Sequence, residues 1–109
     1  IFTNGENIAD LGGANIAFDA LQMYLKDHGE VAKISGLSQN ERFFIAWATV
    51  WRSLTTDQNL TNQIKTDPHA PDYLRAFAPL TNVEAWYQTF GVKQGDKLYR
   101  KPQDRVKIW

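Results

Sequence analysis

Residues 38–54 read SQNERFFIAWATVWRSL, and this stretch decides the fold. Ser38 and Glu41 have the S/T-x-x-E spacing of a capping box, in which each side chain satisfies a backbone donor at a helix start. The apolar residues that follow recur at helical spacing and make a wide face: Phe43, Phe44, Trp47, Val50, Trp51 and Leu54. The sequence therefore predicts a helix that continues through Leu54 and lies at the centre of the core.

A second helix is predicted near the N-terminus. Thr3 and Glu6 repeat the capping-box spacing, and His28-Gly29 is a plausible stop. Between them, apolar residues recur at helical spacing: Ile8, Leu11, Phe18, Leu21 and Leu25. Gly12-Gly13 inside this helix costs about 1 kcal/mol per residue relative to alanine. The glycine pair therefore indicates that another backbone or a site approaches closely.

The segment between these helices and the part after residue 54 contain shorter elements. We expect a connector over 30–37 and a short peripheral helix over 55–66. Pro68 and Pro71 force a loop over 67–71, because each proline disfavours helical geometry in the residue before it. A single helical turn is expected within 72–77.

The C-terminal third contains one more helix and a tail. Thr81 and Glu84 form a third capping-box pattern, which predicts a helix ending at Gly91. The tail from Val92 onward is basic and irregular, its last residues 106–109 are expected to be extended, and Trp109 is expected to be packed. The fold class predicted is all-α.

Composition limits the function classes. The chain has 109 residues, of which 43% are hydrophobic and 13% aromatic, enough for one domain with a modest core. Lysine plus arginine and aspartate plus glutamate number 12 each, which removes the electrostatic drive for nucleic-acid binding. With no cysteine, thiolate metal sites and a cysteine nucleophile are excluded. The N-terminus, Ile1-Phe2-Thr3, resembles the middle of a longer chain, so we expect residues 1–109 to be a single fragment.

Four side chains are candidates for chemistry. Glu6 and Asp10 lie one helical turn apart, so both carboxylates project from one face and can serve one cation or one histidine. Equally, the pair can be ordinary helix-start acids. His69, between two prolines, either faces a cleft or is solvated, and Arg75 either clamps a substrate carbonyl or pairs with an acid. Neither a serine-nucleophile motif nor a phosphate loop occurs in the sequence.

The order of several motifs resembles one protein family. GENIAD followed by GG (residues 5–13), RFF with WA and VW (42–51), TDPHAP (66–71) with Arg75, FGV (90–92) and RVKIW (105–109) match, in order, the neprilysin and endothelin-converting-enzyme family of zinc metallopeptidases, which includes bacterial oligopeptidase O. The resemblance spans essentially the whole chain. It implies the C-terminal helical part of a thermolysin-like catalytic domain that hydrolyses short peptides with one zinc ion, which activates water and polarises the scissile carbonyl.

The resemblance also implies a role for each candidate residue. Glu6 corresponds to the third zinc ligand, and Asp10 to an aspartate that hydrogen-bonds a ligand histidine and is sometimes described as a proton donor. His69 corresponds to the histidine that stabilises the oxyanion, and Arg75 to the arginine that binds a substrate backbone carbonyl.

Two departures from the family pattern affect these expectations. H-E-x-x-H is absent, because the histidines are His28 and His69 alone. Two zinc ligands and the general base are therefore missing, and we expect the isolated fragment to be inactive and to bind zinc weakly. The lack of cysteine favours a bacterial member, since vertebrate members carry structural cysteines in this region. Its localisation is unknown, with an extracytoplasmic compartment slightly favoured.

The expected partners are peptide substrates and the missing N-terminal part of the parent peptidase, with no nucleic acid. Loss of the partner half exposes apolar surface, which predicts self-association or rearrangement of the first helix. Two other readings remain open. One is a non-catalytic helical module that binds a peptide or protein through its aromatic surface. The other is a structural subunit with no peptide site, in which Glu6 and Asp10 are merely helix-start acids.

Overall fold

The computed structural model describes residues 2–108, which form an all-α chain as predicted. Residues 2–108 contain no β-strand and have one isolated β-bridge, between Ile34 and Leu37. In chain order the elements are α1 (Asn4–His28), α2 (Gln39–Val50), α3 (Asp57–Thr66), α4 (Asp72–Arg75), the 3-10 helix η1 (Leu80–Asn82), α5 (Glu84–Phe90) and the 3-10 helix η2 (Pro102–Asp104).

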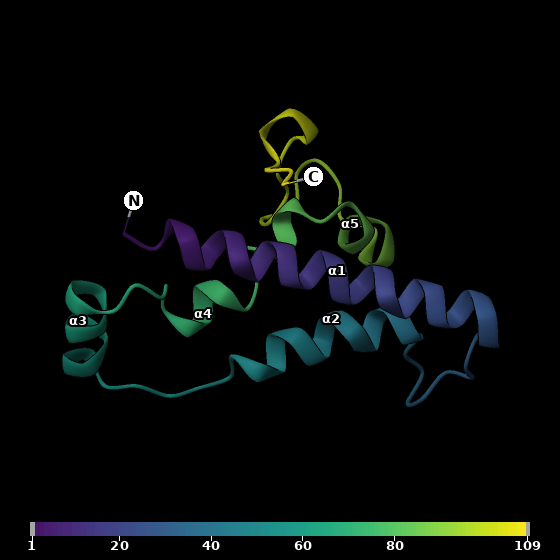
Figure 1. Cartoon of the computed structure of the whole chain (residues 1–109), viewed down its shortest axis with the longest axis horizontal. Coiled ribbons are helices and arrows are strands. Elements are labelled where there is room, and N and C mark those ends of the chain that lie inside the picture. Colours follow the sequence, from purple (N-terminus) through teal and green to yellow (C-terminus); the bar gives the residue numbers. More distant parts are fainter. Residues whose placement is uncertain (1, 109) are drawn as a thin grey trace.

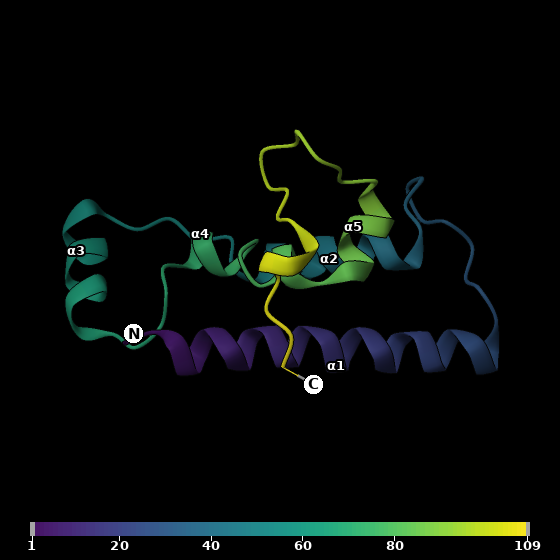
Figure 2. The ribbon, with the colours of Figure 1, turned by 90° about the horizontal axis from the view of Figure 1, so that it is seen from above.

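In Figure 1, α1 crosses the view between α5 on one side and α2 and α4 on the other. Seen from above, α1 runs along one side of the molecule and the other three helices lie on the same side of it (Figure 2). Helix α3 stands beyond α4 at the end where α1 begins, and the chain after α3 returns to the first turns of α1 (Figure 2). This return brings residues 67–75 to the N-terminal end of α1. The candidate site lies at this meeting point.

The core is aromatic and is shared by α1, α2, η1 and α5. The ring of Phe18 stacks on Phe44 with 5.0 Å between centroids, and Phe43 meets both rings edge-on. Buried members of this cluster are Leu11, Ala14, Phe18, Phe44, Leu80, Val83, Trp86 and Tyr87. Each large ring removes much apolar surface from water, and α2 contributes Phe44 to this buried cluster, with Phe43 and Trp47 packed against it.

The predicted capping box of α2 is confirmed. The Glu41 N–H donates to Ser38 Oγ at 3.2 Å, and the Ser38 N–H donates to the Glu41 carboxylate at 2.7 Å. The latter bond lowers the pKa of the Glu41 carboxyl below its ordinary value. The predicted extension through Leu54 is wrong, because α2 ends at Val50 and Leu54 is fully exposed. Ser53 Oγ instead donates to the Asp72 carboxylate at 2.7 Å and ties this non-helical connector to α4.

The other two capping boxes do not form. Thr3 adopts helical backbone geometry, so its hydroxyl caps no backbone donor and instead accepts from the Asn7 amide at 3.3 Å. Thr81 lies within η1, where its hydroxyl donates to the Ala78 carbonyl at 2.8 Å. The helices still begin near the predicted positions. Their starts are therefore set by packing rather than by side-chain caps.

The remaining elements follow the sequence closely. Helix α3, the loop over 67–71 and the turn α4 occupy the predicted segments. Helix α5 ends at Phe90 and is capped by Gly91, whose φ of 64° favours glycine. The tail is irregular apart from η2, and the prediction of a packed Trp109 lies outside the described residues. No helix within 2–108 is long and apolar enough to cross a membrane.

Helix α1 differs from the prediction on its second face. Gly12 is buried, but the space beside Gly13 is open, so no backbone among residues 2–108 approaches Gly13 closely. Leu11, Phe18 and Leu25 face the core as predicted. Ile8 was predicted for the same face but is 49% exposed. Ile16 and Met23, which were not part of that prediction, are also exposed. The helix thus carries apolar side chains on two faces, one of which the described chain leaves open.

Candidate functional site

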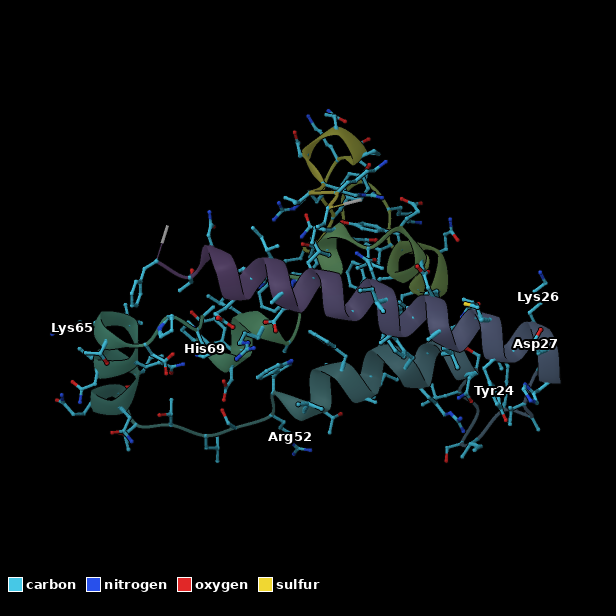
Figure 3. All side chains as sticks on the ribbon, in the orientation of Figure 1. Tyr24, Lys26, Asp27, Arg52, Lys65 and His69 are labelled. Atoms are coloured by element: carbon cyan, nitrogen blue, oxygen red, sulfur yellow. The ribbon has the colours of Figure 1, made fainter. Side chains whose placement is uncertain are left out.

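The four residues singled out from the sequence meet at the N-terminal end of α1. Glu6 and Asp10 come from its first turns, Arg75 ends α4, and His69 lies in the loop between α3 and α4. Figure 3 shows His69 between the start of α1 and α4. The structure therefore brings together residues that are more than sixty positions apart in sequence.

Asp10 and Arg75 form a bidentate ion pair. Arg75 Nε donates to one Asp10 oxygen at 2.7 Å and Nη2 donates to the other at 2.8 Å. The two side chains are only 10% and 14% exposed. The hydrogen bonds to Asp10 raise the pKa of the Arg75 guanidinium, which carries its charge at any physiological pH. The acid-pairing interpretation of Arg75 is thus realised, and its outer edge remains available for a further acceptor.

Two tryptophans of the α2 region hold Arg75 as well. The Trp51 ring lies under the guanidinium, 3.7 Å from its central carbon to the ring centroid. Trp47 Nε1 donates to the Arg75 backbone carbonyl at 3.0 Å. Because Trp47 and Trp51 are one helical turn apart, the end of α2 holds both the main chain and the side chain of Arg75.

Glu6 and His69 form the other half of the site. His69 Nε2 lies 3.2 Å from a Glu6 carboxylate oxygen, and both side chains are about two-fifths exposed, 41% for His69 and 43% for Glu6. On the opposite edge of the ring, Nδ1 lies 2.7 Å from Asp67 Oδ1. The imidazole is therefore held between two carboxylates, and an imidazolium donates from both ring nitrogens in this arrangement.

Asp67 is a site residue that the sequence reasoning did not select. Its Oδ1 accepts from the His69 backbone N–H at 2.8 Å as well as from the ring. These two bonds lower the pKa of the Asp67 carboxyl below its ordinary value. The Asp-Pro-His order was the available signal, because an aspartate readily bonds a backbone N–H two residues ahead. Asp67 fixes the orientation of the histidine ring.

The described residues do not make a metal site by themselves. Within residues 2–108, no group of three histidine, cysteine, aspartate or glutamate side chains is arranged to hold a metal ion. Glu6 is a half-exposed carboxylate near the N-terminal end of α1, so it can supply one oxygen ligand. A catalytic zinc site takes three protein ligands and usually includes nitrogen donors, so this donor set is incomplete for zinc.

A pocket of about 700 Å³ opens beside Trp51, and its lining includes none of the four site residues. It lies between the end of α2, α3 and α4, and its lining includes Trp51, Leu54, Leu60 and Tyr73. Tyr73 and Leu54 are exposed, at 61% and 104%. Trp51 therefore contacts the guanidinium of Arg75 and also lines this pocket.

Comparison with known proteins identifies relatives of this chain. Residues 1–106 match the family model described as peptidase family M13. The neutral endopeptidase of Lactococcus lactis is 41% identical over 104 residues, which are 95% of this chain and 15% of that protein. Human neprilysin is 35% identical over 111 residues, covering 100% of this chain and 14% of its own length. The chain thus spans about one seventh of these relatives.

A solved structure has the same fold. The zinc metalloprotease Zmp1 of Mycobacterium tuberculosis, in complex with an inhibitor, superposes with a TM-score of 0.94 at 41% sequence identity. The match covers 99% of this chain and 16% of that one. It confirms the prediction of a helical part of such a peptidase. With a family model covering nearly every residue and a solved relative of the same fold, the chain belongs to peptidase family M13.

Proposed function

We propose that this chain is part of a zinc-dependent endopeptidase that hydrolyses short peptides, and that it supplies one zinc ligand and the groups that hold the substrate. One observation carries the proposal. Residues from α1 and from 67–75 gather at one end of the fold, where Glu6 meets His69 at 3.2 Å and Asp10 meets Arg75 at 2.7 Å. Membership of a peptidase family supports the same assignment.

In this proposal Glu6 is the zinc ligand of the chain, and the other ligands come from the rest of the peptidase. Zinc, when bound, supplies Lewis-acid polarisation of the peptide carbonyl. Asp10 orients one of the ligand histidines from its position one turn after Glu6. Each Asp10 oxygen accepts one bond from Arg75 and retains a lone pair, so the carboxylate can serve both partners.

His69 and Arg75 act on the substrate. Asp67 fixes the His69 ring through Nδ1. The other ring nitrogen, Nε2, donates a hydrogen bond to the oxygen on which negative charge develops. Arg75 donates from its outer edge to a backbone carbonyl of the bound peptide. The Asp10 pair holds that edge in a fixed direction, which lowers the entropy lost when the peptide binds.

The proposed protein partner is the remainder of the peptidase chain, packed on the open face of α1. Ile8, Ile16 and Met23 are 49%, 59% and 69% exposed on this helix. Exposed apolar side chains spaced along one face of a helix favour burial against another part of a protein. Without that cover, we expect the chain by itself to self-associate.

Zinc content tests the ligand assignment in the intact peptidase. Glu6→Gln removes a charged ligand, so the purified enzyme should hold much less than one zinc ion per chain, as measured by atomic emission. Asp10→Asn should weaken zinc affinity by roughly 10- to 100-fold, because it acts through a ligand. Glu30→Gln, at an exposed connector position, is the matched control. Full zinc occupancy in a folded Glu6→Gln enzyme would refute the proposal.

A further inference from the structure

The ring face of Trp51 lies against a site side chain, the guanidinium of Arg75. The central carbon of the Arg75 guanidinium is 3.7 Å from the Trp51 ring centroid, well within the distance at which a cation is attracted to an aromatic face. Asp10 occupies the Nε and Nη2 side of the same guanidinium. One neighbour therefore fixes the plane of Arg75, and the other fixes its rotation within that plane.

A bidentate carboxylate alone leaves a hinge motion about the line between the two hydrogen bonds. A ring packed flat against the guanidinium blocks this motion, because tilting would lose contact with the aromatic face. One hydrogen of Nη1 and the second hydrogen of Nη2 form the end-on fork of the Arg75 guanidinium, and the direction of this fork is then fixed. These are the donors assigned above to a substrate carbonyl.

The polar atom of Trp51 does not explain its presence. The indole Nε1 is buried and has no hydrogen-bond partner among the described residues. Buried indole nitrogens are normally paired, so within the described residues Trp51 acts on Arg75 through its ring face and not through its donor. The contrast is Trp47, whose Nε1 donates to the Arg75 carbonyl.

We propose that Trp51 is a positioning residue for substrate binding, whose ring face holds the Arg75 guanidinium flat against Asp10 so that its outer edge faces the peptide carbonyl. This inference rests on the proposed function, because it takes the substrate contact of Arg75 from there. The competing role follows from the pocket beside Trp51. In that role the ring contacts a substrate side chain directly and Arg75 is not involved.

A double-mutant cycle in the intact peptidase separates these roles. Trp51→Leu removes the aromatic face, and KM should rise roughly 3- to 30-fold, with kcat and zinc content nearly unchanged. In an Arg75→Ala background the same substitution should change KM less than twofold, because no guanidinium remains to position. Trp51→Phe keeps a ring face, and Trp51 Nε1 makes no hydrogen bond within residues 2–108, so this variant should keep most of the affinity of the unmodified enzyme.

The substrates are two quenched fluorescent peptides that differ only in the residue after the scissile bond, leucine or alanine. Positioning through Arg75 predicts the same rise in KM for both peptides, because the contact is to the backbone. If Trp51→Leu does not fold, a series of enzymes with increasingly fluorinated tryptophan at position 51 replaces it in the experiment. Fluorination weakens the attraction for a cation at nearly constant ring shape, so KM should rise with each added fluorine.

Two results would overturn the inference, and they differ in what else fails. If Arg75→Ala raises KM but Trp51→Leu has its full effect in that background, or acts on the leucine peptide alone, Trp51 does not work through Arg75 and the proposed function stands. If Arg75→Ala leaves KM unchanged in a folded, zinc-loaded enzyme, the substrate contact of Arg75 and the role of Trp51 fail together.

Discussion

The two ion pairs of the site differ in how completely this chain encloses them. Asp10 and Arg75 are 10% and 14% exposed and are joined by two hydrogen bonds, whereas Glu6 and His69 are 43% and 41% exposed and meet at one pair of atoms. Both pairs join α1 to the segment after α3. The Asp10–Arg75 pair, called the closed pair below, is therefore largely covered by the chain. The Glu6–His69 pair, called the open pair, faces outward.

The cause is the set of neighbours around each pair. Trp47 in α2 and Trp51 directly after it pack against Arg75, so this pair is largely covered by the end of α2. His69 is held from its own loop by Asp67, whose carboxylate is also 42% exposed. An exposed ion pair contributes little to stability because water competes for both partners. We therefore expect the Asp10–Arg75 pair to contribute more to the stability of the fold than the Glu6–His69 pair, in addition to its proposed role at the site.

The largest expected effect is on stability, from breaking the closed pair. Asp10→Asn leaves the largely covered Arg75 charge without its partner, so the free energy of unfolding of the chain should fall by about 2–4 kcal/mol. Urea unfolding followed by circular dichroism measures this loss. Asp19→Asn, at an exposed position of the same helix, should change stability by less than about 0.5 kcal/mol. Equal losses in the two variants would contradict the contrast between the pairs.

The next effect is on catalysis, from breaking the open pair. His69→Ala in the intact peptidase should lower kcat by about 10²-fold, because the lost donor meets charge that develops only in the transition state. Zinc content and stability should change little. His28→Ala is the control, since that ring stacks on Tyr24 at the far end of α1. A fully active and folded His69→Ala enzyme would leave His69 as an ordinary loop residue.

The smallest effect concerns pH and sharpens the role of Asp67. The pKa of its carboxyl is lowered by the two bonds from His69, so the stabilisation is present above the unfolded pKa, near 4, and is lost as pH falls through the lower folded pKa. The His69 amide proton resonance should therefore titrate with a midpoint below about pH 4. In Asp67→Asn this titration should disappear. A midpoint above the ordinary aspartate pKa would show that the bonds do not form.

The sequence by itself determined the elements and the candidate residues. Helical periodicity located α1, α2 and α5, two prolines located the loop that contains His69, and spacing placed Glu6 and Asp10 one turn apart. The ordered motifs identified the family. These features depend on residues near each other in the chain, and local backbone preferences are sufficient to determine them.

Only the tertiary structure decided how those pieces are used. Three segments have the same capping-box spacing, yet the box forms at Ser38 alone, because Thr3 and Thr81 are drawn into helical geometry and other bonds. Apolar periodicity predicted that α2 continues through Leu54, but the helix ends at Val50. In the connector that follows, Ser53 donates a hydrogen bond to Asp72.

The pairing within the site was likewise a tertiary outcome. From their spacing alone, Glu6 and Asp10 were equally suited to pair with any nearby basic side chain. In the folded chain His69 lies beside Glu6, and Arg75 pairs with Asp10. Nothing local links Trp51 to Arg75 or singles out Asp67. These contacts depend on the path by which residues 67–75 return to α1 and α2. That path is set by the packing of segments distant in sequence, whose relative positions no local pattern records.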